Sequence, residues 1–269
     1  MDNEKIKEML LDIASTDLDF TVTQSGKESC RVNGLYKPDT HEIILHNRNF
    51  KTDSEVVYTS IHEYTHHLIC EEQLALNGSS YMYNAKVHTE AFWARFHSLL
   101  KIAEDKKYYS MDIDSVPELK ELTENIQKNY IEANGKIMAE FGRLLSKAHA
   151  LCQKANIRYE DYIDRVLCLP RNSARDITRV GKVQDVNPAI GFDNMKMISA
   201  IKKPEQRAEA QEQILAGESP LTVRSLMKQK AQQPVDQKTK LEKEKNRLSK
   251  TIAQLQQRLE FVEESLASL

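Results

Sequence analysis

The sequence predicts an α+β fold in which a small antiparallel sheet with a helix bearing His-Glu-x-x-His precedes an all-α helix-turn-helix region and a C-terminal coiled-coil helix. Three observations support this prediction. Short extended runs lie between residues 20 and 45, the apolar spacing becomes helical after residue 52, and leucines recur at spacings of 3 and 4 near the end. Because 269 residues exceed one ordinary domain, we expect domains at residues 1–110, 118–230 and 236–269.

The first elements alternate between helical and extended patterns. Residues 4–14 carry apolar side chains at helical spacing, which predicts a short opening helix. The sheet is expected to contain the extended runs Phe20–Val22, Cys30–Val32, Gly34–Tyr36 and His41–Leu45. Pro38 and Asp39 supply the turn between the last two runs.

Two helices are expected to follow the sheet. Thr52 and Glu55 have the spacing of a capping box, so a helix should start there and continue to about Glu71. Its buried stripe should consist of Val57, Ile61, Tyr64 and Leu68. After a loop around Gly78–Ser80, a second helix is predicted from about His88 to Glu104.

The motif His62-Glu63-Tyr64-Thr65-His66 lies inside the first of these helices. Residues four apart share one helix face, so His62 and His66 can bind one Zn²⁺ together. Glu63 is offset from them and can take the proton from a water on the metal as that water attacks a carbonyl. The competing interpretation is a solvated helix that happens to carry histidines.

A catalytic zinc needs a third protein ligand and an open fourth position. His88 is the favoured ligand because an imidazole at the start of the next helix can point back at the motif, while Phe92 and Trp93 pack below it. Glu90 is the alternative donor.

These segments together resemble a known family. The extended Gly34–Tyr36, the His62-Glu63-x-x-His66 motif and His88-x-x-x-Phe92-Trp93 are similar to the SprT-like and related zinc peptidases. The resemblance covers roughly residues 20–105 and implies a small zincin-type sheet beside two helices, zinc on three side chains, and peptide-bond hydrolysis. The chain departs from the family at Thr89, where many members have Gly, and lacks a following cysteine ribbon. A weaker similarity to ImmA/IrrE-type peptidases, which are associated with repressor cleavage, rests on Glu90-Ala91 and Leu99-Leu100.

The other candidate side chains near the motif have ordinary structural interpretations. His67 points away from His66 and is expected to be a polar neighbour or a support for the ligands. Structural or surface positions are expected for His41, His46, His97 and His149. Tyr81 and Tyr83 precede His88 and could donate to an oxyanion, although loop packing is favoured for both.

The region from residue 118 to residue 186 reads as several helices after a linker at 112–117. One helix should bury Ile137, Phe141, Leu144, Leu145 and Ala148. After a short break at Leu167–Pro170, a further helix aligns four cations on one side: Arg171, Arg175, Arg179 and Lys182. A helix with such a stripe after a turn is typical of helix-turn-helix proteins that enter a DNA major groove. A solvated amphipathic helix is the other interpretation.

The charge distribution and a second resemblance both favour DNA binding by the later helical region. Residues 1–100 hold 9 Lys and Arg against 15 Asp and Glu, whereas residues 151–230 hold 14 against 10, so only the later region favours a polyanion. Residues 137–228 resemble the helical DNA-binding region of ParB-type partition proteins. The motifs that carry this resemblance are Gly142–Leu145, Ser173–Arg175, Pro204–Arg207 and Thr222–Leu226.

The C-terminal segment follows a hinge expected at Gln232–Pro234. Apolar residues from Leu241 to Leu269 recur at spacings of 4 and 3 over about four heptads, with Lys245 at one seam position. This pattern predicts a coiled coil and a homo-oligomer, and Lys245 favours a dimer. The same helix folded back on its own chain is the alternative.

Two functions fit these features. The first is a zinc-dependent endopeptidase that hydrolyses a DNA-associated or regulatory protein and is targeted by its DNA-binding helices. The second is a non-enzymatic DNA-binding regulator, or a partition-type factor of a mobile element, with a structural zinc. No apolar run approaches the roughly 18 residues that suggest a membrane span, and the first four residues, Met1 to Glu4, lack a signal-peptide layout, so we expect a cytoplasmic protein.

Overall fold

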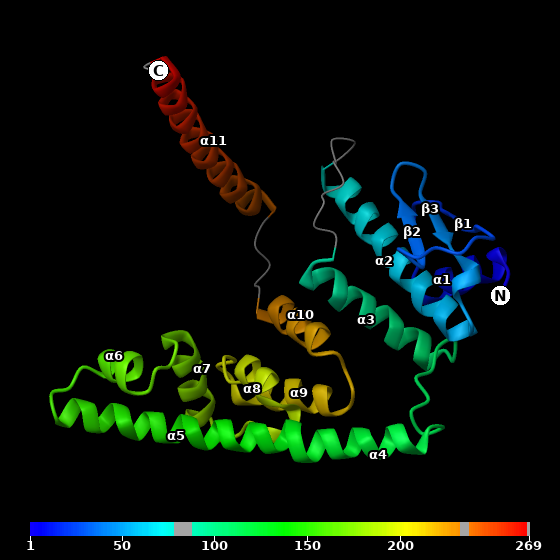
Figure 1. Ribbon diagram of the computed structural model, residues 1–269. Helices are drawn as coiled ribbons and strands as arrows, with labels where there is room; N and C mark the ends of the chain where they lie inside the picture. Colours follow the sequence, from blue (N-terminus) through cyan, green and yellow to red (C-terminus); the bar gives the residue numbers. More distant parts are fainter. Residues whose placement is uncertain (78–87, 232–236, 268–269) are drawn as a thin grey trace. The chain divides into compact units, whose positions relative to one another are not determined.

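The fold is described from a computed structural model of the chain, for residues 1–77, 88–231 and 237–267 (Figure 1). The chain divides into two compact units, residues 1–227 and residues 228–269, and each is described by itself.

A three-stranded sheet lies near the N-terminus. Its strands are β1 (Thr21–Gln24), β2 (Gly34–Lys37) and β3 (Glu42–Leu45), in the order β1-β3-β2. β2 and β3 form the expected antiparallel hairpin, but β1 runs parallel to β3, so the prediction of an antiparallel sheet was wrong. The reason is the connection over residues 25–33. It leads from β1 at one edge of the sheet to β2 at the other edge, and β3 then fills the central position between them. The run Cys30–Val32 belongs to this connection and is not a strand.

Helices cover the sheet, and their ends have identifiable caps. α1 (Asn3–Ile13) begins where the Asp2 side chain accepts from the amide of Lys5. α2 (Asp53–Asn77) begins with the predicted capping box, since the Glu55 amide donates to Thr52 Oγ1 at 3.3 Å and the Thr52 amide donates to Glu55 Oε2 at 3.1 Å. α2 continues past the expected end at Glu71. The loop predicted at residues 78–80 lies outside the described residues.

α3 (Glu90–Asp105) is capped by Thr89, whose hydroxyl accepts from the amide of Phe92 at 3.2 Å. His88 therefore precedes the helix, and the prediction that His88 opens it was wrong. The cap also gives a physical reason for threonine at position 89, because a hydroxyl satisfies a helix N-terminus and glycine offers no side-chain acceptor.

One hydrophobic core joins these elements. The predicted stripe of α2 is buried as expected: Val57, Ile61, Tyr64 and Leu68. It packs against apolar side chains of α1, the sheet and α3. The helix that carries His62 and His66 is thus fixed on several sides.

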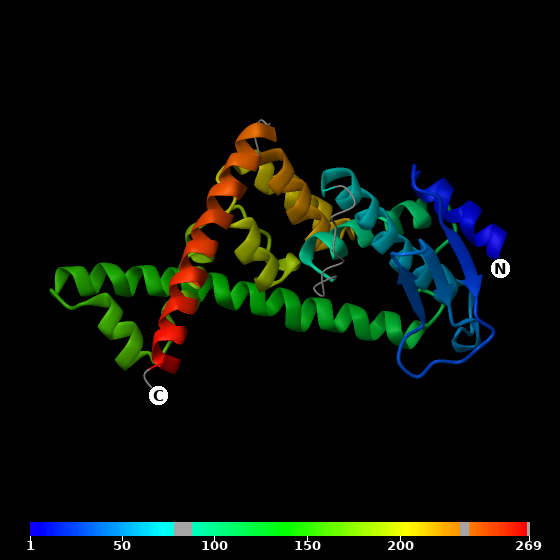
Figure 2. The same cartoon turned by 90° about the horizontal axis from the view of Figure 1, so that it is seen from above.

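The rest of the first unit is helical. A continuous rod is formed by α4 (Pro117–Ile126), the π-helical segment η3 (Gln127–Glu132) and α5 (Ala133–Lys154), as Figures 1 and 2 show from two directions. The elements that follow it are α6 (Tyr159–Asp161), η4 (Tyr162–Val166), α7 (Arg171–Lys182), η5 (Pro188–Ile190), α8 (Phe192–Ile198), α9 (Pro204–Leu215) and α10 (Pro220–Ala231). A short 3-10 helix, η1 (Asn47–Asn49), precedes α2.

The buried face of α5 differs in part from the prediction. Leu145 is buried, but Ile137 and Leu144 are 64% and 53% exposed. The contact with α7 lies instead at Gly142 and Gly181, where a Cβ on Gly142 would come within 2.1 Å of the Ile177 carbonyl oxygen. Backbone approach at glycines sets the buried side here, which an apolar pattern does not reveal.

The second unit holds α11 (Gln237–Ala267). Its predicted seam residues are exposed where their side chains are described: Leu248, Ile252, Leu255, Leu259, Val262 and Leu266. Lys245 is exposed as well. The hinge at 232–234, the side chain of Leu241 and Leu269 lie outside the described residues. Among the described helices, none has the length and apolarity needed to cross a membrane.

Candidate metal centre

The candidate centre forms where α2 meets the residue before α3. His62 and His66 are one turn apart on α2, and His88 faces them from the segment ahead of the Thr89 cap. His88 Nε2 lies 3.0 Å from His62 Nε2 and 3.2 Å from His66 Nε2. All three predicted ligands therefore converge on one point.

The donor set fits a metal ion. A tetrahedral ion with metal–nitrogen bonds of about 2.0–2.1 Å holds two ligand nitrogens about 3.3 Å apart. The two measured separations are within a few tenths of an ångström of that value, and the three donor atoms all lie within 4.8 Å of one another. Three imidazoles can hold a metal ion here.

Aromatic side chains of α3 pack against the three imidazoles and fix their positions. The ring of Phe92, fully buried, has its centroid 4.9 Å from that of His62, 4.4 Å from that of His66 and 4.8 Å from that of His88. Trp93 stacks on His88 at 5.7 Å. The sequence predicted this packing, which orients the three imidazoles toward one another.

The environment favours neutral histidines, which is the form that binds metals. Burial lowers the pKa of His62 to about 4, with a smaller contribution from His88. Burial lowers the pKa of His66 to about 3, with smaller contributions from His62 and His88. The imidazoles of His62 and His66 are therefore neutral at pH 7, so each has a nitrogen lone pair that can bind a metal ion.

Glu63 lies beside the histidines and against β2. Its side chain is buried, and burial raises its pKa to about 7, although a hydrogen bond from the Tyr36 amide works in the opposite direction. A Cβ on Gly34 would lie 2.9 Å from Glu63 Cγ and 2.8 Å from Thr59 Cγ2. Glycine at position 34 therefore avoids a steric clash with the side chain of Glu63.

A cavity of about 440 Å³ opens over this cluster. Its lining includes His62, Glu63, His66 and His88 together with Val32, Leu35 and Tyr58. Val32, Leu35 and Tyr58 are 39–47% exposed, so apolar surface adjoins the metal ligands. A chain segment could reach the cluster from this side.

His67 points into the protein, away from the cluster. Its Nε2 lies 3.1 Å from the Leu18 carbonyl oxygen, a contact that requires an N–H, so Nδ1 can accept from the Tyr36 hydroxyl at 3.3 Å. His67 is fully buried and supports α2 from the side of the sheet.

The remaining described histidines contribute no ligand atom to the cluster. His41 Nδ1 contacts the Tyr36 hydroxyl at 2.9 Å, and His46 Nδ1 contacts Ser25 Oγ at 2.9 Å. His97 packs on Phe96. Tyr81 and Tyr83 lie outside the described residues.

Glu90, the alternative third ligand, has another partner. Its Oε1 lies 3.0 Å from Arg224 Nε on α10, and it is not part of the metal-binding group found among the described residues. The geometry therefore brings His88, and not Glu90, to the two motif histidines.

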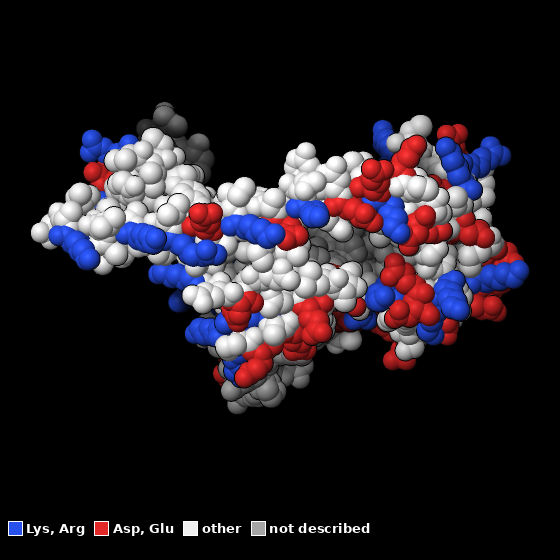
Figure 3. All heavy atoms as spheres, turned by 90° about the horizontal axis from the view of Figure 1, so that it is seen from below, with Lys and Arg blue, Asp and Glu red and all other residues white. Residues whose placement is uncertain are grey.

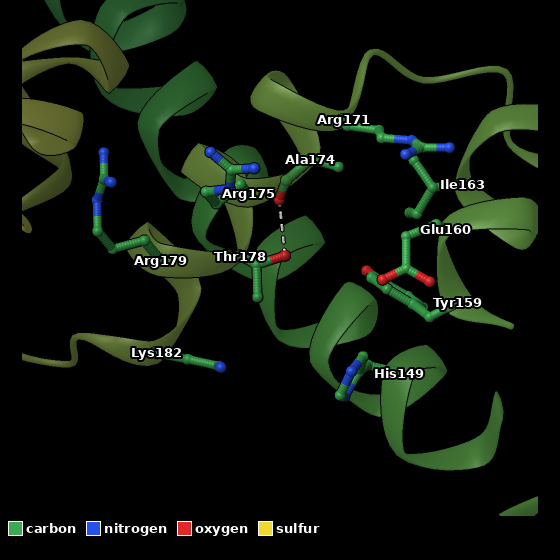
Figure 4. A pocket seen from close by; sticks show the side chains of 10 residues that line it. All are labelled: His149, Tyr159, Glu160, Ile163, Arg171, Ala174, Arg175, Thr178, Arg179 and Lys182. Atoms are coloured by element: carbon green, nitrogen blue, oxygen red, sulfur yellow. Dashed lines mark hydrogen bonds between the residues drawn. The ribbon is translucent and has the colours of Figure 1, made fainter. Parts of the chain in front are cut away.

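The four predicted DNA-binding cations line a second cavity, of about 420 Å³, together with His149, Tyr159 and Glu160 (Figure 4). They differ in their partners. Arg171 pairs with Asp164, and Arg179 pairs with Asp176 at 2.8 Å. Arg175 and Lys182 make no ion pair within the ranges that the structure describes.

Sequence reasoning missed several residues of both sites. Tyr58 at the metal cluster carries no motif of its own, and His149 and Tyr159 at the cationic cavity carry none either. Tyr58 lies one helical turn before His62 on α2, whereas His149 on α5 and Tyr159 on α6 meet the cations of α7 only through the tertiary fold.

No family model matches this chain, and no curated protein and no solved structure matches it either. The function is therefore argued from the geometry of the two sites.

Proposed function

We propose that this chain is a zinc-dependent endopeptidase whose catalytic centre consists of His62, His66, His88 and Glu63. The observation that carries the proposal is the convergence of three imidazole nitrogens beside a buried carboxylate in an open cavity. Three imidazole ligands with space for a fourth group are typical of catalytic zinc, whereas structural zinc has four protein ligands.

In this proposal the residues around the site have separate catalytic and substrate-binding roles. Zinc, when bound, would polarise the scissile carbonyl and acidify a water. Glu63, with its pKa near 7, can accept a proton from that water and return it to the leaving amine. The exposed edge beside Val32 and Leu35 would bind the substrate segment. The substrate proposed is a DNA-associated or regulatory protein.

Glu63→Gln separates catalysis from metal binding. We expect this variant to retain one zinc per chain and to lose cleavage by at least about a hundredfold, measured as new peptide termini in a peptide library by mass spectrometry. Glu72→Gln, an exposed position on the same helix, is the matched control and should retain both properties.

Metal analysis tests the ligand set. His88→Ala should lose zinc, while Glu90→Ala should retain it, because Glu90 pairs with Arg224. A wild-type chain that binds zinc but cleaves nothing, while it binds DNA, would favour the non-enzymatic regulator instead.

DNA binding by α7 is a second proposed function. It is supported by Arg175 and Lys182, two exposed cations without ion-pair partners among the described residues, on a helix that buries Ala174, Ile177 and Val180 behind them. A helix with unpaired cations on its exposed face can enter a groove of duplex DNA.

Salt dependence tests this second function. Arg175→Ala with Lys182→Ala should weaken duplex binding and reduce the slope of log K against log salt by about 1 to 2. The control pair is Arg158→Ala with Arg165→Ala, also exposed but paired with Glu160 and Asp161. Equal effects of the two pairs would remove α7 as the DNA-binding element.

A further inference from the structure

The cavity of about 420 Å³ beside α7 lies between three helices (Figure 4). Arg175, Arg179 and Lys182 of α7 lie along one side of it, and His149 of α5 and Tyr159 of α6 lie along the other. Small-molecule sites in proteins usually have volumes of about 300–1,000 Å³. The cavity therefore has room for a small molecule.

Two cations of this cavity are available to a ligand. Arg175 and Lys182 are exposed, and neither makes an ion pair or a hydrogen bond with another described residue. They are seven residues apart on α7, so their Cα atoms are about 10.5 Å apart along the helix axis and their side chains leave it within about 20° of each other. Thr178 lies between them on the same side and also lines the cavity. The two long side chains can therefore meet over Thr178 on one anionic group.

The other Arg and Glu side chains that line the cavity have partners of opposite charge: Arg171 has Asp164, Arg179 has Asp176, and Glu160 has Arg158. Within the described residues, the charge without a partner in the cavity is thus the two positive charges of Arg175 and Lys182. A phosphate monoester carries about −1.5 to −2 at neutral pH, whereas each phosphodiester of a DNA backbone carries a single negative charge. One monoester phosphate therefore balances both cations.

The rest of the cavity wall includes aromatic and apolar side chains. The rings of Tyr159 and His149 meet edge to face, with their centroids 4.7 Å apart. Ile163 and Ala174, both buried, also line the cavity. Small-molecule sites combine such apolar and aromatic walls with a few polar groups that fix the orientation of the ligand. A ligand of this cavity is thus expected to carry a ring next to its phosphate.

We propose that this cavity binds a small phosphate monoester that carries an aromatic or apolar ring. Arg175 and Lys182 hold the phosphate through charge-assisted hydrogen bonds, and the ring lies against Tyr159 and Ile163. Neither peptidase activity nor groove binding by α7 is required for this site. A phosphate at the 5′ end of a DNA strand has the same chemistry, so the two sources must be separated by experiment.

Calorimetry with the full chain measures the binding of three probes: phenyl phosphate, inorganic phosphate, and methyl phenyl phosphate, a diester with one charge. We expect phenyl phosphate to bind one site per chain with a Kd at or below about 1 mM. Inorganic phosphate lacks the ring, and the diester lacks the second charge. Each of these two should therefore bind at least about tenfold more weakly than phenyl phosphate.

Variants of the cavity test the two parts of the site. Arg175→Gln with Lys182→Gln should weaken phenyl phosphate binding at least about tenfold, with unchanged helical circular dichroism because both positions are exposed. Tyr159→Leu should remove the advantage of phenyl phosphate over inorganic phosphate. Lys and Arg side chains also follow one another over α5 in the view from below (Figure 3). Arg143→Gln with Lys147→Gln, exposed positions of α5 outside the cavity lining, is therefore the matched control and should bind like the wild type.

Single-stranded DNA with and without a 5′ phosphate separates the two sources of the group. If the 5′ phosphate strengthens binding at least about tenfold in the wild type but not in Arg175→Gln with Lys182→Gln, the site belongs to DNA ends. Equal binding of the two strands assigns it to a free small molecule. Absence of phenyl phosphate binding, equal binding of the diester, or unchanged binding by the double variant would overturn the proposal, even in a chain that cleaves peptides or binds duplex DNA.

Discussion

Glu71 on α2 holds the segment that joins α1 to the sheet. Its carboxylate accepts from Thr16 Oγ1 at 2.8 Å, from the Asp17 amide at 2.7 Å and from the Leu18 amide at 3.1 Å. Partial burial alone would raise the pKa of Glu71, but these three hydrogen bonds outweigh it, so the pKa lies below its ordinary value. The charged form is therefore the one that stabilises the fold.

Glu71→Gln should lower the free energy of unfolding by about 1–3 kcal/mol at neutral pH, because one charged acceptor serves three donors. A lowered pKa in the folded state means that this stabilisation is complete above the ordinary pKa of 4.5 and is lost as the pH falls through the folded value. The difference between variant and wild type in urea unfolding should shrink at acidic pH. Glu72→Gln, exposed beside Arg95, should change stability by less than about 1 kcal/mol at either pH.

For individual residues, the sequence predicted the candidate metal ligands better than the buried contacts that hold α2 in place. The spacing of His62 and His66 follows from helix geometry, and His88 could be chosen because an aromatic pair follows it. The buried contacts of His67 with Leu18 and Tyr36 join segments that are distant in sequence. No local pattern predicts such contacts, so His67 could be assigned only a polar supporting role.

The crossing of α5 and α7 is made by two glycines. A Cβ on Gly142 would lie 2.8 Å from Gly181 Cα, and a Cβ on Gly181 would lie 2.4 Å from the carbonyl carbon of Gly142. Both neighbours are backbone atoms, which cannot rotate away as a side chain can. The helices can approach this closely only because neither residue has a side chain.

Gly142→Ala should therefore destabilise the helical region, although alanine is the better helix former by about 1 kcal/mol. Separating two packed backbones costs about 1–3 kcal/mol or more, so the packing effect should exceed the gain in propensity. Thermal unfolding followed by circular dichroism measures the result. Gln153→Ala, exposed on the same helix, is the control, and a more stable Gly142→Ala variant would contradict this description of the crossing.

Helix positions followed from the sequence, whereas the direction of β1 and the buried side of α5 did not. Capping residues and apolar spacing are local signals, and they placed the starts of α1, α2 and α3 within a few residues. The parallel pairing of β1 with β3 depends on the path of residues 25–33, and the buried side of α5 depends on Gly142 meeting α7. Both are tertiary outcomes that a local pattern leaves open.

For the molecule as a whole, a bound metal ion should increase the stability of the N-terminal core. His62 and His66 belong to α2, and His88 adjoins α3, so an ion bound by all three would join two helices that share that core. Binding only to the folded state adds about 2.7 kcal/mol when the free metal is a hundred times its dissociation constant. A chelator should therefore lower the Tm of the wild-type chain and leave that of His88→Ala unchanged. Equal shifts in both would contradict a site that needs all three histidines.

The hydrogen bond from Thr222 Oγ1 to the Ala94 carbonyl oxygen, 3.2 Å long, joins residues 128 positions apart, and the Arg224–Glu90 ion pair lies beside it. During synthesis, α3 leaves the ribosome long before α10 does. α3, which begins just after His88, thus completes these contacts only after α10 has been translated. A chain truncated ahead of residue 220 would lack this hydrogen bond and this ion pair, so part of the support for α3 comes from residues more than a hundred positions later in the sequence.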